Sequence, residues 1–305
     1  MTTRLFICFG RLPLLLAFLV LAAGCGDSAS NGTGGTAPSA ADIVVDVGWL
    51  ADRLGDSSTQ VVDARTTQSE FDAGHIPGAI RLDPLELSSA VGGVQAQVAP
   101  ASLAGPLLRE RGIRAGTTLV VYGKPPEFDP ARVVWAMRYY GHDDVRYLDG
   151  GWAAWQAAGG AVETGPSGEP SSDYEMGAPV DALRVTADWI VDQLGAPPDD
   201  DPAIQIVDAR SPKEFAAGRI PGALHVQWTR NLEEGFLLPR EDIEALHAGL
   251  DKKKTTVVYC LVGWRASFGW IALELLGFED VRVYDGSWLE WGAGGFPIET
   301  DGGVS

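Results

Sequence analysis

The sequence predicts an α/β protein that consists of two copies of one domain, each with a central, mainly parallel sheet flanked by helices. The first observation is an internal repeat, because the motifs of residues 60–79 (Asp-Ala-Arg, Glu-Phe and Ile-Pro-Gly-Ala) recur in the same order in residues 205–223. The second is that short β-branched runs alternate with helical apolar patterns. A later pair of segments, Asp149–Trp152 and Asp285–Trp288, extends the repeat, so the chain is a tandem duplication.

The elements of the second copy can be placed from their residue patterns. We expect strands near residues 183–185, 205–208, 223–226, 255–259 and 281–284. Helices are expected near residues 187–194, 212–217, 240–250, 264–276 and 288–292. Residues 211–214, Ser-Pro-Lys-Glu, form a capping box with proline at the first helical position, and residues 67–70, Thr-Gln-Ser-Glu, are its counterpart in the first copy.

The segment before the repeat has the features of an export signal. After a short basic start, the apolar run of residues 12–23 is too short and wrongly flanked for a membrane span. It ends in Leu-Ala-Ala-Gly-Cys, which resembles the lipobox of bacterial lipoproteins, with Ala22 where leucine is usual. This resemblance implies that residues 1–24 are a lipoprotein signal peptide and that Cys25 is lipidated.

The domain boundaries follow from composition. Residues 25–41 are rich in Gly, Ser, Thr and Ala, as a flexible tether would be. The first copy should span residues 42–163 and the second residues 180–305, joined by a linker at residues 164–179 that is rich in Gly, Pro and Ser. With lipidation, this organisation predicts an exported bacterial lipoprotein that faces the periplasm or the cell exterior and contacts the membrane through its N-terminal lipid only.

The chain is strongly acidic. Loss of residues 1–24, which contain Arg4 and Arg11 and no acidic residue, would change its formal charge from −18 to −20. A protein with this charge is repelled by nucleic acid and by anionic lipid. An anionic substrate would therefore have to be attracted by a local cluster of arginine side chains and backbone N–H groups.

Cys260 is the candidate catalytic residue. It lies between a predicted strand and a predicted helix, so the backbone N–H groups of the next five residues can converge on its sulfur, with the positive end of the helix aimed at the same point. None of the five is proline, and Gly263 can take a positive φ without steric cost. These donors and the guanidinium of Arg265 would stabilise a thiolate. The five residues are Leu261, Val262, Gly263, Trp264 and Arg265.

A buried core cysteine is the alternative, since free cysteine is often buried. The cysteine count favours a catalytic role for Cys260 instead. Cys8 would leave with the signal peptide and Cys25 would carry lipid, so Cys260 would have no partner for a disulfide. The first copy has Gly123 at the matching position, followed by Lys124 and two prolines that lack an N–H. We therefore expect the first copy to be non-catalytic.

These features are similar to the landmarks of the two-domain rhodaneses, which are thiosulfate sulfurtransferases. The landmarks are Asp-x-Arg, Gly-His-Ile-Pro-Gly-Ala, the Val-Val-Tyr-Cys loop and Asp-Gly-Gly-Trp, and they occur in that family's order from Asp42 to about Ile298. The resemblance implies two rhodanese-like domains, of which the second carries the catalytic cysteine. It also implies transfer of a sulfane sulfur from thiosulfate to cyanide or a thiol through a Cys260 persulfide, with no metal or organic cofactor.

The resemblance implies roles for further residues. Arg265 matches an arginine that closes the loop near the persulfide, and the loop residues 261–264 would hold the substrate sulfur with it. Arg210 matches a residue that contacts the anionic donor. Trp228 matches an aromatic residue at the cleft of some bacterial members, with ordinary core packing as the equal alternative. Arg65, the counterpart of Arg210, would either face the cleft or form a structural salt bridge.

Three other functions stay open. A related phosphatase or arsenate reductase needs Cys-x5-Arg around a tetrahedral oxyanion, whereas Cys260 to Arg265 is Cys-x4-Arg, which suits a single sulfur atom. A 3-mercaptopyruvate sulfurtransferase resembles Cys-Gly-Ser-Gly-Val-Thr, in place of which this loop has larger residues. A sulfur carrier would pass the persulfide only to a protein acceptor. No metal site is expected, because His75 and His225 lack the spacing of metal ligands.

Overall fold

The computed structural model describes residues 43–126, 128–166, 170–195 and 204–304. The predicted signal peptide, Cys25 and the predicted tether lie outside these residues, so the prediction of lipidation stays untested. Within the described ranges, no helix combines the length and the apolar character that a membrane span requires.

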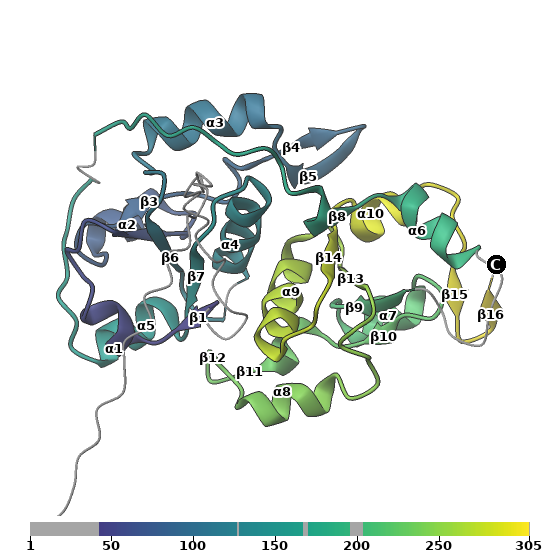
Figure 1. Ribbon diagram of the computed structural model, residues 1–305. Coiled ribbons are helices and arrows are strands. Elements are labelled where there is room, and N and C mark those ends of the chain that lie inside the picture. Colours follow the sequence, from purple (N-terminus) through teal and green to yellow (C-terminus); the bar gives the residue numbers. More distant parts are fainter. Residues whose placement is uncertain (1–42, 127, 167–169, 196–203, 305) are drawn as a thin grey trace, which may run out of the picture. The chain divides into compact units, whose positions relative to one another are not determined.

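The first half of the chain forms a five-stranded parallel sheet with helices on both faces (Figure 1). One face is covered by α1, α2 and α5, and the other by α3 and α4. The strand order is β1 (Val44–Val45), β7 (Val145–Leu148), β6 (Thr118–Tyr122), β2 (Thr59–Asp63) and β3 (Ile80–Arg81). The helices are α1 (Val47–Ala51), α2 (Gln68–Ala73), α3 (Ala101–Glu110), α4 (Asp129–Tyr139) and α5 (Gly151–Ala157).

The second half repeats this topology, which confirms the duplication. Its parallel sheet has the order β8 (Arg184–Val185), β14 (Val281–Tyr284), β13 (Thr256–Tyr259), β9 (Gln205–Asp208) and β10 (Leu224–His225), so each strand occupies the place of its counterpart in the first sheet. The helices are α6 (Ala187–Leu194), α7 (Pro212–Ala217), α8 (Arg240–Leu246), α9 (Trp264–Leu276) and α10 (Ser287–Trp291). Short hairpins complete it: β11 (Leu232–Glu233) with β12 (Phe236–Leu237), and β15 (Glu299–Thr300) with β16 (Gly303–Val304).

Most predicted elements are confirmed, with two differences at helix ends. Helix α8 ends at Leu246 instead of residue 250, because His247 leaves the helical conformation with φ −109° and ψ 13°. Ser211 and Glu214 form the predicted capping box, but Thr67 makes no side-chain cap at the start of α2. Its partner in that prediction, Glu70, pairs with the ammonium of Lys124 instead.

The central strands are buried on both faces, as parallel strands usually are. In β13, Val257 and Tyr259 pack under α6 and α10, whereas Val258 packs with α8 and α9, and Cys260 follows on that second face. The cluster around α9 continues into the first domain through α4, and the ring of Tyr147 meets the edge of Phe268 with centroids 5.8 Å apart. The two domains thus share one hydrophobic cluster.

A hairpin from each domain binds the same motif of the other domain. The first-domain hairpin, β4 (Ser88–Val91) with β5 (Val94–Val98), ends in an N–H of Val98 that donates to Oδ2 of Asp285, at 2.7 Å. In the second domain, the N–H of Leu237 in β12 donates to Oδ1 of Asp149, at 2.9 Å. Because Asp149 and Asp285 are counterparts in the repeat, the two domains contact each other reciprocally.

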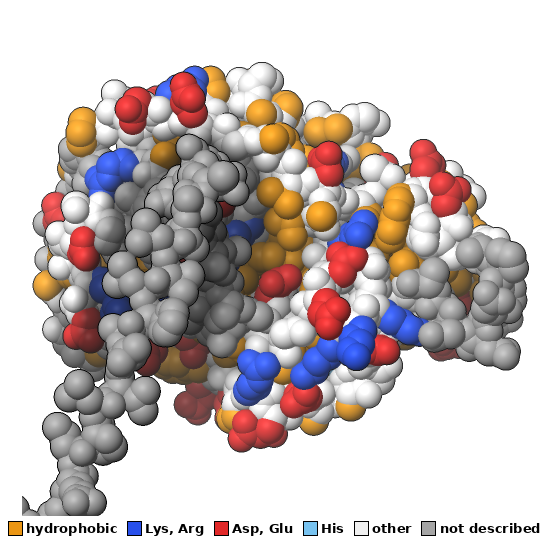
Figure 2. All heavy atoms as spheres, viewed as in Figure 1, with side chains coloured by type: hydrophobic (Ala, Val, Ile, Leu, Met, Phe, Trp, Pro, Cys, Tyr) orange, Lys and Arg blue, Asp and Glu red, His pale blue; other side chains and the backbone are white. Residues whose placement is uncertain are grey.

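Charged surface side chains are interspersed on the face drawn in Figure 2, where Lys and Arg lie among Asp and Glu. Ion pairs show the same local compensation, including Lys252 with Glu244 at 2.5 Å and Arg219 with Glu299 at 2.6 Å. Such exposed or partly exposed pairs contribute little to stability and mainly keep positive charge locally balanced.

Candidate active site

The backbone of Cys260 is held by the segment that follows β14. Cys260 comes directly after β13, and its side chain is fully buried. Its N–H donates to Oγ of Ser287, at 3.1 Å, and its carbonyl accepts from the N–H of Trp288, at 3.0 Å. The cysteine is therefore fixed at the carboxyl end of a central strand, where open α/β sheets bind their ligands.

The loop after Cys260 has the free donors that a sulfur cradle needs. None of the backbone N–H groups of residues 261–265 donates a hydrogen bond to another described residue. Gly263 has a φ of +82°, and α9 begins at the next residue. A Cβ at Gly263 would lie 2.5 Å from Oδ1 of Asp285, so only glycine fits here. The loop can present N–H groups and the positive end of a 13-residue helix to an anionic sulfur.

Arg265, the last residue of the cysteine loop, is held in place by Glu214. Its Nη1 and Nη2 donate to the two carboxylate oxygens of Glu214, at 2.9 and 2.8 Å. The pKa of Arg265 is raised, first by these hydrogen bonds against the cost of burial, and then by attraction to Cys260 and a hydrogen bond with it. The hydrogen bonds from Arg265 lower the pKa of Glu214 to about 2. The structure thus brings two predicted residues together and adds Glu214, which the sequence marks only as a capping residue.

Arg210 is 1% exposed and is bound by other protein groups. Its Nε and Nη2 donate to the carboxylate of Asp208, and Nη2 also donates to the carbonyl of Gly218, at 2.6 Å. Its guanidinium carbon lies 4.2 Å from the ring centroid of Trp288. Arg65 makes the matching contacts in the first domain. Because the same network occurs where there is no cysteine, it gives both arginines a structural role and argues against the predicted donor contact of Arg210.

The aromatic residues predicted for the site pack between the domains. Trp228 is 8% exposed and meets Phe128 and Phe268 edge-on, which favours the core-packing alternative. Trp264 is also buried, and its Nε1 donates to the carbonyl of Ala96 of the first domain, at 3.1 Å. Of the predicted loop residues, Leu261 alone has a largely exposed side chain, at 40%.

The two histidines considered as metal ligands bind backbone carbonyls. Nδ1 of His75 lies 2.9 Å from the carbonyl of Phe71, and Nε2 of His225 lies 2.9 Å from the carbonyl of Arg210. Among the described residues, no group of three or more His, Cys, Asp or Glu side chains is placed to hold a metal ion.

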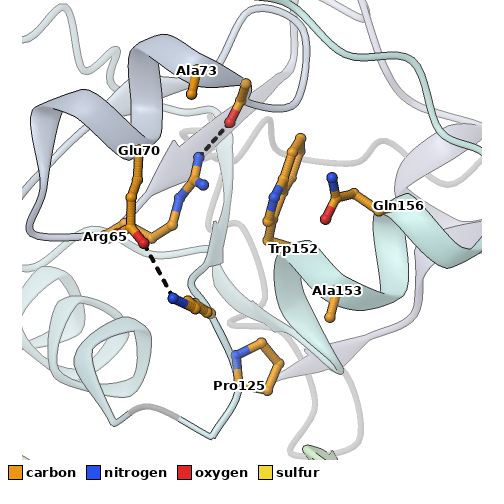
Figure 3. Close-up of a pocket in the computed structure, with 9 residues that line it drawn as sticks. Arg65, Glu70, Ala73, Pro125, Trp152, Ala153 and Gln156 are labelled. Atoms are coloured by element: carbon orange, nitrogen blue, oxygen red, sulfur yellow. Dashed lines mark hydrogen bonds and ion pairs between the residues drawn. The ribbon is translucent and has the colours of Figure 1, made fainter.

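The first domain has a cavity of about 490 Å³ beside the loop that matches the cysteine loop (Figure 3). Figure 3 shows Arg65, Glu70 and Trp152 at its wall. Lys124 also lines the cavity, and its ammonium donates to the carboxylate of Glu70, at 3.2 Å. Gly123 precedes this loop, so the cavity has no sulfur nucleophile at the place of Cys260. Its arginine and its lysine each have a carboxylate partner. The first domain therefore lacks the thiol that Cys260 provides in the second domain.

Comparisons with known proteins agree with this geometry. A family model described as rhodanese-like domain matches residues 46–158 and residues 186–293. A putative thiosulfate sulfurtransferase of Mycolicibacterium smegmatis is 32% identical over 280 residues, covering 85% of this chain and 98% of the relative. A thiosulfate sulfurtransferase of Corynebacterium glutamicum is 34% identical over 283 residues, covering 84% and 90%.

A solved structure is similar over most of the chain. The 3-mercaptopyruvate sulfotransferase SseA from Escherichia coli superposes with a TM-score of 0.72 and 29% identity, covering 81% of this chain and 99% of that one. The relatives named for thiosulfate and the structure named for 3-mercaptopyruvate thus share both domains with this chain, but they differ in the sulfur donor that their names give.

Proposed function

The chain belongs to the rhodanese-like family, and from that premise we propose that this sulfurtransferase uses thiosulfate as donor and cyanide or a thiol as acceptor, through a persulfide on Cys260. The observation that carries the proposal is the loop of residues 261–265, whose backbone N–H groups donate to no other residue that the structure describes. The loop follows Cys260 directly and ends at Arg265, which Glu214 holds in place. A cysteine with donors and a guanidinium at its sulfur is equipped for an anionic sulfur intermediate.

The reaction has two displacements. The Cys260 thiolate attacks the outer sulfur of thiosulfate, the S–S bond of the donor breaks, and sulfite leaves with the electron pair. The acceptor nucleophile then attacks the terminal sulfur of the persulfide and releases the thiolate. Loop N–H groups and the Arg265 guanidinium stabilise the negative charge on sulfur in both states.

Two alternative functions are each supported by a separate observation. Similarity to SseA of Escherichia coli favours 3-mercaptopyruvate as donor. Against it, Leu261, Val262, Trp264 and Arg265 are larger than the small and hydroxyl residues expected in such a loop. The exposed side chain of Leu261 beside the cysteine favours a carrier that hands its sulfur to a protein partner, since an apolar residue there could contact one.

A thiocyanate assay on the form that lacks residues 1–25 tests the proposal. Turnover should be faster with thiosulfate than with 3-mercaptopyruvate. Intact-mass measurement after thiosulfate treatment should show one added sulfur on the wild type and none on Cys260→Ser, whose hydroxyl cannot form a persulfide. Faster turnover with 3-mercaptopyruvate would show that this compound, and not thiosulfate, is the preferred donor. Persulfide formation without turnover would favour a sulfur carrier that passes its sulfur to a protein. An added sulfur on Cys260→Ser would refute the nucleophile.

We also propose that the protein is exported and anchored by lipid on Cys25, with the flexible composition of residues 26–41 as its tether. A single acyl chain binds membranes only marginally, with an association constant on the order of 10⁴ M⁻¹, so stable anchoring needs the several chains of a lipoprotein cysteine. Cys25→Ala should move the protein from the membrane fraction to the soluble fraction. A wild type found in the soluble fraction, or a variant that stays with the membrane, would contradict this.

A further inference from the structure

The carboxylate of Asp285 lies between the cysteine loop and the first domain, and it is fully buried. On the loop side, it is so close to Gly263 that a Cβ there would lie 2.5 Å from its Oδ1. On the domain side, its Oδ1 accepts from Nη1 of Arg132, at 2.8 Å, and Oδ2 accepts from the N–H of Val98, at 2.7 Å. Arg132 belongs to α4 and is also fully buried.

A second contact joins the cysteine loop to the first domain. The carbonyl of Ala96 accepts from Nε1 of Trp264, at 3.1 Å, and from Nη2 of Arg132, at 3.4 Å. At the C-terminal end of the loop, Gly263 therefore rests on Asp285 and Trp264 on Ala96 of the first domain. Arg132 binds both Asp285 and Ala96. The N-terminal end is fixed through Ser287, two residues after Asp285. Both ends of the loop thus depend on the position of one short segment.

The counterpart site shows that domain contact alone does not need this arginine. Asp149 accepts the N–H of Leu237 as Asp285 accepts that of Val98. Counting back nine residues from Gly141 and from Gly277 places Phe268 of α9 at the position of Arg132. The hairpin bond is therefore present on both sides, whereas the arginine is present only on the side that has a cysteine.

We propose that Arg132 of the first domain is a positioning residue for sulfur transfer, acting through Asp285 on Gly263 and thereby on the shape of the Cys260 loop. A buried ion pair is weak evidence for stability by itself, because desolvation of both charges offsets their attraction. It can fix one geometry here, because each partner is held by further groups. Asp285 also accepts from Val98 and lies 3.7 Å from Nε of Arg184, and Arg132 also donates to the carbonyl of Ala96. The catalytic loop is then shaped by both domains, and the proposal rests on the proposed function of Cys260 as sulfur acceptor.

The test compares Arg132→Gln with Asp149→Asn, which alters the matching contact in the domain that has Gly123 in place of a cysteine. Single-turnover persulfide formation from thiosulfate, followed by intact mass, should be slowed about tenfold to a hundredfold in Arg132→Gln at saturating donor, because small displacements of a reacting group cost factors of this size. The donor concentration for half-maximal rate should change less than about twofold, since the loss lies in positioning and not in binding. Asp149→Asn should form the persulfide at nearly the wild-type rate.

Hydrogen exchange of the peptide that covers residues 259–267 gives a readout that needs no sulfur donor. Exchange at Cys260 and Ser267, whose N–H groups are bonded, should be faster in Arg132→Gln and unchanged in Asp149→Asn. Equal effects of the two variants on rate and exchange, or an unchanged rate in Arg132→Gln, would overturn the proposal. If the wild type forms no persulfide with any donor, the proposed function fails, and exchange alone then decides about the loop.

Arg132→Lys covers the case in which Arg132→Gln does not fold. Lysine keeps the charge for Asp285 but cannot also reach Ala96 with a second nitrogen, because it has a single ammonium instead of a fork. We expect an intermediate loss of rate with a wild-type unfolding transition. Folded Arg132→Lys could instead form the persulfide at the wild-type rate, with hydrogen exchange in the loop as slow as in the wild type. The double contact of Arg132 with Asp285 and Ala96 would then be unnecessary, and the assignment of Arg132 would be overturned.

Discussion

Glu214 and Arg265 form a two-point ion pair that joins the first turn of α7 to the first turn of α9, with Nη to Oε distances of 2.9 and 2.8 Å. The same carboxylate accepts from the N–H of Ser211 at the start of α7. Glu214 is therefore fixed by its own helix and can hold the guanidinium of Arg265 in reach of Cys260. In the first domain, Glu70 makes a one-point pair with Lys124 at 3.2 Å instead.

Replacing Glu214 should slow sulfur uptake. In Glu214→Gln the guanidinium of Arg265 loses a charged partner and is no longer held toward Cys260, so persulfide formation should fall about tenfold, the equivalent of about 1.4 kcal/mol. The rate should fall with thiosulfate and with 3-mercaptopyruvate alike, because the pair acts on the cysteine and not on one donor. Single-turnover mass spectrometry measures this.

Glu70→Gln is the matched control, because it removes the corresponding carboxylate from the domain that has Gly123 in place of a cysteine. Its rate should equal that of the wild type. Loss of rate in both variants, or in neither, would show that the pair does not act on the cysteine.

Replacing Arg210 should destabilise the fold rather than weaken donor binding. Arg210→Ala leaves the buried carboxylate of Asp208 without its cation, a change that typically costs about 3–5 kcal/mol of the free energy of unfolding. Arg65→Ala should cost a similar amount, because Arg65 and Asp63 form the same pair with 2.5 Å between Nη2 and Oδ2. Urea unfolding of both variants measures the effect. A stable Arg210→Ala with a raised KM for thiosulfate would restore the predicted donor contact.

The sequence could predict the elements because their signals are local. The strand that ends at Tyr259, the glycine at residue 263 and the helix that follows are all visible in one short segment, and their boundaries were nearly those of β13 and α9. The duplication was visible for the same reason, since each copy carries its own motifs. Cys260 and Arg265 could be placed together because only four residues separate them.

Contacts between distant residues could not be predicted in this way. Glu214 and Arg265 are 51 residues apart, and Arg132 and Asp285 are 153 apart, so no local pattern connects them. The Asp-x-Arg motif predicts which residue is present but not where its side chain points. It predicts a charged residue at the end of β9, but the direction of the Arg210 side chain depends on Gly218 and Trp288, which close over it only in the folded domain.

Glu274 should make the stability of the protein fall between mildly acidic and neutral pH. It lies on α9, where burial raises its pKa to about 7, against the attraction of Arg138 on α4 and with a further increase from the charge of Asp280. Its ordinary value is 4.5, so between these two values the folded state holds a proton that the unfolded state has lost. The stabilising contribution is therefore complete below pH 4.5 and is lost as the pH rises through 7.

Glu274→Gln removes this titration, because glutamine stays neutral. The variant should melt at a higher temperature than the wild type at pH 8 and near the wild-type temperature at pH 5. A gain of about 1 kcal/mol would raise Tm by roughly 2–4 °C in a chain of this size. Thermal unfolding at the two pH values measures this. Glu279→Gln is the control, because Glu279 is exposed and lies three residues after the end of α9. If both variants shift Tm by the same amount at pH 8, the effect comes from net charge and not from burial of Glu274.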